Sequence, residues 1–278
     1  MFMAGDNSLG QLWVPPAATN VVAVAAGGWH SLALRADGRI IGWGDDWDGQ
    51  CEVPASLGPA VGIAAGGYHS LALRGDKTVV GWGADDSGQA APPAGLSNVT
   101  AIAAGTWHSL ALRADGKVVA WGDNSWGQTS VPAGLANVTA VAAGGSHSLA
   151  LRADGTVVAW GENTDAQGNY AGQSNVPYGL SDVVAISAGE YHSLAVRRGG
   201  QVVAWGDNKL GQCSPPASLP PVAALAGGGA HSVASLTNGN LAAWGDNRNG
   251  QCNLPAGITN AAAIAAGNAH TLILLSRP

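Results

Sequence analysis

The chain has 278 residues, is rich in glycine (42 residues), and only 11% of its residues are charged. Its formal net charge of −6 argues against a general nucleic-acid-binding protein, because such proteins carry a basic surface. The uncharged stretch 14–34 contains prolines and glycines and is not expected to cross a membrane. Asp6 and Gly10 interrupt any apolar run at the N-terminus, so no secretion signal is expected.

A repeat of 39 residues organises the sequence. It is marked by the seven histidines, which follow one another at intervals of 39, 39, 39, 45, 39 and 39 residues. Each histidine precedes Ser or Thr and an apolar run, and in most repeats a Trp-Gly pair and a Gly-Gln pair follow. A period of about 40 residues with several short strands is typical of a β-propeller blade. The histidines are His30, His69, His108, His147, His192, His231 and His270.

Each repeat is predicted to form four short antiparallel strands, and the third repeat is a clear example. Its strands are predicted at 99–104, 108–113 and 117–122, with a short outer strand near 128–131. The Ala-Asp-Gly sequence at 114–116 is a hairpin signal. In chain order, the pattern predicts one domain, 1–278, with blades at about 21–54, 60–93, 99–132, 138–177, 183–216 and 222–255, and a seventh made of 261–278 and 1–15.

The seventh blade is expected to join the two ends of the chain. The last repeat stops after two strands, while the segment 2–11 matches the third strand and following loop of the other repeats. Pairing of these segments is expected to close the ring of an all-β, seven-bladed propeller and to remove exposed sheet edges. Ala4 stands where the other blades have Trp, so we expect the seam in the seventh blade to be packed less tightly than the other blades.

Three phrases carry a family resemblance: AAGGYHSLALR at 64–74, VVAWGDNSWGQ at 118–128 and VPAGL at 131–135. They resemble the regulator of chromosome condensation repeat, and the short period is most similar to the branch that contains β-lactamase inhibitory protein II. The resemblance implies a propeller that binds a protein, with an inhibitory role, on the surface of a bacterial cell or outside it. It also implies contacts from loop aromatics on one face, at Trp29, Tyr68, Trp107 and Tyr191.

Residues that recur in every repeat are expected to belong to the scaffold. Neighbouring side chains on a strand point to opposite faces, so His108 and Ser109 are not a base and nucleophile pair. Histidines on different blades are too far apart to bind one metal ion at about 2 Å. We expect structural hydrogen bonds from the histidines, packing between blades from the Trp-Gly tryptophans, and contacts to loop backbone from the Gly-Gln glutamines.

No acid, base and nucleophile converge in the sequence pattern, so the protein is not expected to be an enzyme or to hold a cofactor or metal. The acidic segment 45–49 lacks the alternating ligands and distal Glu of a calcium loop. Cys51, Cys213 and Cys252 lie on different blades, and a disulfide needs Cα atoms within about 7 Å. We therefore expect three free thiols.

Residues that break the repeat are better candidates for a site. The loops after the first and third strands lie on one face, where aromatic and acidic residues gather. The recurring Asp after Trp-Gly is expected to cap its own turn, whereas the additional acids of blades 1 and 2 are not explained in this way. The predicted partner-binding residues are Trp29, Trp47, Tyr68, Trp107, Trp126, Tyr170, Tyr191, Asp45, Asp46, Asp48, Asp85, Asp86, Asp123 and Glu190.

The pattern favours a monomer that binds a protein with a basic or mixed-charge surface. Three alternatives stay open at this point. The aromatic and acidic residues also suit a lectin-like propeller, the chain also suits a structural module of a larger bacterial surface protein, and the rings also fit simple packing over their own loops. No contact with nucleic acid or membrane is expected.

Overall fold

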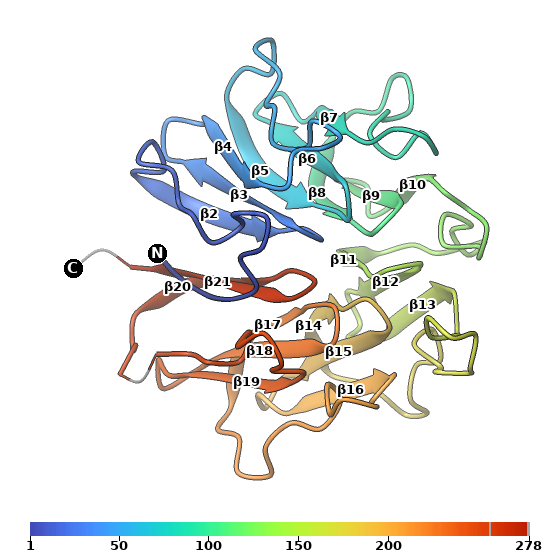
Figure 1. The fold of residues 1–278 in the computed structure, drawn as a ribbon. Helices are drawn as coiled ribbons and strands as arrows, with labels where there is room; N and C mark the ends of the chain where they lie inside the picture. Colours follow the sequence, from blue (N-terminus) through green and yellow to red (C-terminus); the bar gives the residue numbers. More distant parts are fainter. Residues whose placement is uncertain (256, 277–278) are drawn as a thin grey trace.

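The computed structural model describes residues 1–255 and 257–276, and every regular element in this part of the chain is a β-strand (Figure 1). The strands form seven separate three-stranded antiparallel sheets, the blades, whose strands we name A, B and C from the centre outwards. This confirms the predicted all-β, seven-bladed architecture.

The blades follow one another along the chain, and the last takes its third strand from the N-terminus. Blades 1 to 3 are β2 (Val21–Ala26), β3 (His30–Arg35), β4 (Ile40–Gly44); β5 (Ala60–Ala65), β6 (His69–Arg74), β7 (Val79–Gly83); and β8 (Val99–Ala104), β9 (His108–Arg113), β10 (Val118–Gly122). Blades 4 to 7 are β11 (Val138–Ala143), β12 (His147–Arg152), β13 (Val157–Gly161); β14 (Val183–Ala188), β15 (His192–Arg197), β16 (Val202–Gly206); β17 (Val222–Gly227), β18 (His231–Leu236), β19 (Leu241–Gly245); and β20 (Ala261–Ala266), β21 (His270–Leu275), β1 (Phe2–Gly5).

The predicted fourth strand is wrong: no blade has one within the described residues. In blade 3, the segment near 128–131 forms tight turns, in which Ser130 N donates to Gly127 O at 3.0 Å and Val131 N donates to Thr129 O at 2.9 Å. Pro132 follows and has no N–H to donate. The backbone groups that a fourth strand would need are therefore used locally or missing.

The predicted pairing of the chain ends is present. Strand β1 pairs antiparallel with β21, with Phe2 opposite Ile273 and Gly5 opposite His270. Blade 7 also contacts blade 1, because β2 lies against both β20 and β21. At the inner turns, Asn268 N donates to Gly27 O at 3.3 Å. No sheet closes on itself, so the blades are joined by these contacts rather than by a continuous ladder.

The seven histidines make structural hydrogen bonds, as predicted, and the structure shows that these bonds connect neighbouring blades. In each blade, His Nε2 lies 2.8–3.1 Å from the hydroxyl of a Ser or Thr on the next blade, as in His69 and Ser109. Ser109 Oγ donates its proton to Gln89 O, so His69 Nε2 must donate to Ser109. Burial lowers the pKa of each histidine to about 3 or 4, which keeps the rings neutral.

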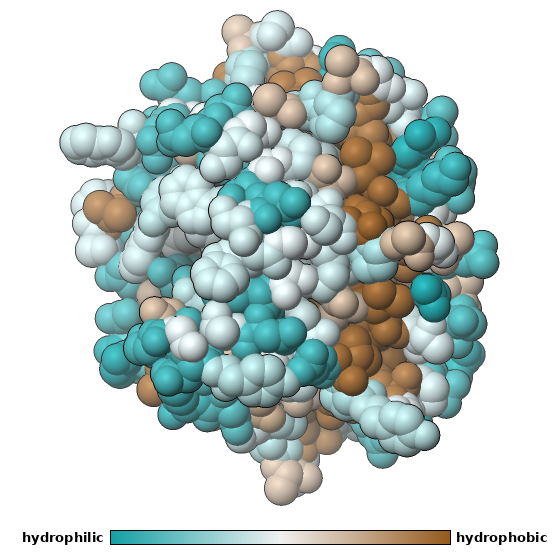
Figure 2. Space-filling view, turned by 90° about the vertical axis from the view of Figure 1, so that its right-hand side faces the viewer, coloured by the Kyte–Doolittle hydropathy of each residue, from teal (hydrophilic) through white to brown (hydrophobic). Residues whose placement is uncertain are grey.

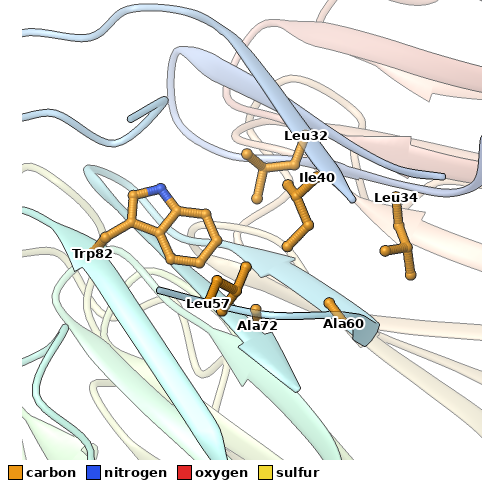
Figure 3. Close-up of a cluster of buried hydrophobic side chains, with 7 residues drawn as sticks. All are labelled: Leu32, Leu34, Ile40, Leu57, Ala60, Ala72 and Trp82. Atoms are coloured by element: carbon orange, nitrogen blue, oxygen red, sulfur yellow. The ribbon is translucent and has the colours of Figure 1, made fainter. Parts of the chain in front are cut away.

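The hydrophobic core lies between blades. Figure 3 shows Trp82 of blade 2 facing Leu32 and Ile40 of blade 1, and these side chains are at least 93% buried. The indole Nε1 of Trp82 donates to Gln50 O at 2.9 Å, so its polar atom is satisfied inside the core. This confirms the predicted packing role of the Trp-Gly tryptophans. On the side that carries β10 and β13, apolar residues gather in one band with hydrophilic residues on either side (Figure 2).

Candidate functional site

The turns between strands A and B and the loops after strand C lie together at one end of each blade. Asp45 N donates to Trp29 O at 3.0 Å and Asp123 N donates to Trp107 O at 2.9 Å. Each of the other blades has the equivalent bond between its own turn and loop. We call the surface formed by these turns and loops the loop face. The turns between strands B and C lie at the other end, on the opposite face, where Ala60 N donates to Gly38 O at 2.9 Å.

The inner ring of predicted aromatics is only partly free. Trp29, Tyr68, Trp107 and Tyr191 are all partly buried. Tyr68 and Trp107 stack on each other with their ring centroids 4.8 Å apart and an angle of 27° between their planes. The rings of blades 2 and 3 therefore support one another, and each still presents part of its surface to solvent.

The outer predicted aromatics are far more accessible. Trp47 is 92% exposed, Tyr170 is 73% exposed and Trp126 is 56% exposed, and all three come from loops that follow a strand C. Tyr170 belongs to the longer loop of blade 4, where it forms an isolated bridge with Thr164 and its hydroxyl accepts a hydrogen bond from Asn175. These three side chains lie on the surface of their loops and do not pack into the hydrophobic core.

Most of the predicted acidic residues have structural partners, which corrects part of the sequence interpretation. Asp45 and Asp123 accept hydrogen bonds from the side-chain amides of Gln50 and Gln128, at 3.0 and 2.7 Å. This is the role expected from the sequence, in which the recurring Asp after Trp-Gly caps its own turn.

Two of the additional acids of blades 1 and 2 were thought to lack a structural explanation, but they have one. Asp46 Oδ1 accepts from Cys51 N at 2.7 Å, and Asp85 Oδ1 accepts from Ala90 N at 2.8 Å. Asn124 makes the same bond in blade 3, so the position organises the loop whether it is Asp or Asn. Asp48 and Asp86 are exposed, and among the described residues no group donates to their carboxylates.

A cleft on the loop face was not found from the sequence. It has a volume of about 460 Å³ and lies over blades 4 to 7, with Trp29 of blade 1 at one side. Its lining includes Ala230 and Ala269, which occupy the positions of Trp29 and Tyr68 in the repeat. The signal was present, because these two alanines interrupt the aromatic series on consecutive blades. A second, smaller hollow of about 120 Å³ lies at the centre of the ring, lined mainly by Ala and Gly.

The longer loop of blade 4 forms one wall of this cleft. Asp165 binds the ammonium group of Lys209 on blade 5, and Lys209 Nζ also donates to Gln167 Oε1 at 3.2 Å. The bond with Lys209 lowers the pKa of Asp165 to about 2, so this carboxylate stays charged. The six extra residues thus reach across to the next blade.

Glu190 and Tyr191 lie next to each other in the cleft. Burial, together with the nearby charge of Glu162, raises the pKa of Glu190, and the adjacent Tyr191 hydroxyl offsets part of this rise. Burial and the neighbouring carboxylates Glu190 and Glu162 raise the pKa of Tyr191 to about 12. No lysine, arginine or histidine in the described chain forms an ion pair with Glu190.

The remaining polar groups do not form a metal or redox centre in the part of the chain that the structure describes. No three His, Cys, Asp or Glu residues are placed to hold a metal ion there. The cysteines are free thiols, as predicted, and burial raises the pKa of Cys51 and Cys213 to about 12 and of Cys252 to about 11. Between residues 1 and 276, leaving out 256, no helix is long and apolar enough to cross a membrane.

Comparison with known families identifies the repeat. The model of the regulator of chromosome condensation (RCC1) repeat matches residues 21–50, 60–89, 99–128, 138–167, 183–212 and 222–251, which is more than half of the chain. The chain belongs to the RCC1 repeat family. The matched stretches each run from strand A to the glutamine after strand C, except in blade 4, where the match ends inside the longer loop.

Several solved structures have a similar fold. Prp20p from Saccharomyces cerevisiae is similar with a TM-score of 0.82 and 20% identity, over 98% of this chain and 90% of that chain. Human WBSCR16 is similar with a TM-score of 0.80 and 20% identity, over 99% of both chains. The CRINKLY WD40 ectodomain of the Arabidopsis thaliana receptor kinase ACR4 is similar with a TM-score of 0.72 and 19% identity, over 92% of this chain and 93% of that chain. No curated protein sequence matches the chain.

Proposed function

We propose that this RCC1-repeat propeller binds another protein through its loop face. The observation that carries the proposal is the set of exposed rings there: Trp47 and Trp126 are 92% and 56% exposed, although Trp is a residue that proteins usually bury. Exposed Trp and Tyr on one face are typical of the residues that contribute most to protein interfaces. In this proposal the partly buried Trp29, Tyr68, Trp107 and Tyr191 support the exposed rings and extend the contact surface.

The similar propellers support a binding role. Prp20p is described as binding Gsp1p and histones, and yeast RCC1 (Prp20) has been solved with Kap60 bound. By analogy, the partner of this chain would be a protein, and the protein would act without catalysing a reaction. An inhibitory role, implied by the resemblance to the β-lactamase inhibitory protein II branch, belongs to this proposal too.

Charge would direct the partner to the loop face. Asp48 and Asp86 are exposed and accept no hydrogen bond within the described residues, so they are free to attract a basic or mixed-charge partner. Exposed charges at the rim of an interface mainly change the association rate. The proposal includes a monomer in solution that binds neither nucleic acid nor membrane.

The proposal is tested by capture of a partner with the immobilised chain from its native source, followed by mass spectrometry. The same capture uses the variant Trp47→Ala/Trp126→Ala/Tyr170→Ala, which removes the exposed rings, and, as a control on the opposite face, Arg39→Gln/Lys117→Gln. We expect one protein to be retained by the wild type and the control but lost with the aromatic variant. A protein retained equally by all three would place the binding surface elsewhere.

A lectin-like function is the second candidate, because the fully accessible Trp47 ring lies between the carboxylates of Asp46 and Asp48 in the sequence. Aromatic faces next to carboxylates suit sugars, because a sugar ring stacks on the aromatic ring and its hydroxyl groups donate hydrogen bonds to the carboxylates. A glycan array separates the candidates. Binding to discrete sugars that disappears in Trp47→Ala would favour the lectin, whereas no binding on the array favours a protein partner.

A further inference from the structure

The cleft on the loop face exists because two consecutive blades carry small side chains. Blades 1, 2, 3 and 5 have an aromatic ring before the histidine, but blades 6 and 7 have Ala230 and Ala269. Both alanines line the cleft, and rings of the size of Trp29 at these positions would fill much of its volume of about 460 Å³. Trp29 and Tyr191 remain as aromatic walls on either side.

The cleft carries more negative than positive charge. Four carboxylates line it, from Asp165, Glu190, Asp207 and Asp246, against two cations, so the formal balance is −2. Lys209 is paired with Asp165, and Arg248 binds Asp246 through two hydrogen bonds of 2.8 and 2.9 Å. Asp207 accepts from the Gln212 amide at 2.8 Å.

Glu190 is the carboxylate that lacks compensation. It is partly buried, its neighbour is the neutral Tyr191 hydroxyl, and no described cation is paired with it. A partly buried carboxylate without a cation is costly, which agrees with the raised pKa of Glu190. A positive group that enters the cleft would remove this cost. The empty volume, the aromatic walls and the unpaired carboxylate therefore point to the same kind of occupant.

The geometry points to a pocket for an arginine side chain of the protein partner, with Glu190 as the ion-pairing residue and Trp29 and Tyr191 as the flanking rings. This inference rests on the proposed function, because it names the chemistry by which the loop face recognises its partner. Arginine fits better than lysine, because its planar guanidinium binds carboxylates with two parallel N–H groups and also stacks on aromatic faces.

The probe is the tripeptide acetyl-Gly-Arg-Gly-amide, compared with the peptides that carry citrulline or lysine in place of arginine. Citrulline has nearly the same shape as arginine but no charge. Binding is followed by NMR through the Trp29 indole and the methyl groups of Ala230 and Ala269. We expect saturable shifts at these three residues with the arginine peptide, weaker shifts with lysine, and none with citrulline. Equal shifts with citrulline or lysine, or shifts that do not saturate, would overturn the inference.

Two variants test the pocket in different ways. Glu190→Gln keeps the shape of the side chain next to Tyr191 but removes the charge, and we expect binding at least about tenfold weaker, which is about 1.4 kcal/mol. Ala230→Trp restores the residue type of blade 1 and should block the pocket. Glu52→Gln, the same change at an exposed position outside the cleft, is the matched control and should bind normally. Unchanged binding by Glu190→Gln, or by folded Ala230→Trp, would contradict the assignment.

The outcome separates this inference from the proposed function. If the arginine peptide binds in the cleft but a captured protein ignores the loop-face variants, the pocket stands and the proposed binding face fails. If the captured protein needs the loop face but the peptide does not bind in the cleft, the proposed function stands and the arginine pocket is wrong.

Discussion

His270 Nε2 lies 3.1 Å from Ser31 Oγ, so the histidine of blade 7 is bonded to the serine of blade 1 although 239 residues separate them in the chain. The same contact joins every other pair of neighbouring blades. The histidine Nδ1 atoms are also buried and have no partner in the described structure. The seven rings therefore stabilise the propeller only in their neutral form.

Acid should destabilise the protein through these histidines. The pKa of His30 is lowered from 6.5 to about 3, so below pH 6.5 the unfolded chain binds protons that the folded chain does not. The free energy of unfolding should therefore be highest above pH 6.5 and fall as the pH decreases toward 4, by up to about 1.4 kcal/mol per pH unit for each histidine.

Urea denaturation at pH 7.5 and 5.5 measures this loss. The aspartates whose pKa is lowered, such as Asp6, lose their contribution only near and below pH 4, outside this interval. Glu190, whose pKa is raised, acts in the opposite direction but is a single group. Equal unfolding free energies at the two pH values would contradict the histidine account.

Removal of residues 1–11 should strongly destabilise the fold. The deletion takes away β1, which leaves β21 as an open edge, and also removes Gln11 O, the acceptor for Trp43 Nε1 at 2.8 Å and Ser31 Oγ at 3.1 Å. We expect aggregation or a loss of several kcal/mol, because a buried donor without a partner costs about 1–3 kcal/mol. A synthetic peptide of residues 1–15, added in trans, should restore part of the stability. A soluble truncated protein that unfolds at the same urea concentration as the wild type would refute this role.

Truncation of two tryptophans to Ala should lower the free energy of unfolding by very different amounts. Trp82 is 7% exposed and lies between blades 1 and 2, so Trp82→Ala should cost about 3–5 kcal/mol of unfolding free energy. Trp47 is 92% exposed, so Trp47→Ala should change stability by no more than about 0.5 kcal/mol. Equilibrium urea denaturation of both variants separates scaffold from surface. Similar losses in the two variants would mean that the Trp47 ring is part of the scaffold.

Blade 2 contains an unpaired amide that one substitution should satisfy. Gln89 Nε2 is buried without a partner, because Ala84 stands where blades 1 and 3 have Asp45 and Asp123. Those aspartates accept from the equivalent glutamines at 3.0 and 2.7 Å. Ala84→Asp should therefore raise the unfolding free energy by about 1 kcal/mol.

The control for this substitution is Ala91→Asp, which adds the same charge at an exposed position of the same loop. It should be neutral in thermal and urea denaturation. If Ala84→Asp lowers stability, the Asp and Gln pair is not the reason for the recurring aspartate.

The repeat in the sequence was enough to predict the blades, the order of strands and the pairing of the chain ends. The histidine interval sets the period, and the match of segment 2–11 to the other repeats predicts β1 beside β21. The fourth strand was wrong because a pattern of turn residues does not reveal which backbone groups are used locally, as at Ser130 and Val131.

The site was harder to predict than the fold. Aromatic residues were located on the correct loops, but the sequence does not separate the stacked Tyr68 and Trp107 from the free Trp47. The loop-bonding roles of Asp46 and Asp85 depend on a contact five residues away that composition does not reveal. The cleft depends on small residues from two blades, so it becomes visible only when the blades are placed side by side.

The binding affinity of the captured partner for the variant Trp47→Ala/Trp126→Ala/Tyr170→Ala tests the central claim most directly. Interface aromatics that dominate binding cost about 2 kcal/mol or more each when truncated, so surface plasmon resonance should record an affinity at least about a thousandfold weaker, at an unchanged melting temperature. Arg39→Gln/Lys117→Gln, on the opposite face, should bind like the wild type. Full affinity in the aromatic variant, or loss of the partner only in the opposite-face variant, would contradict the claim that the loop face is the binding surface.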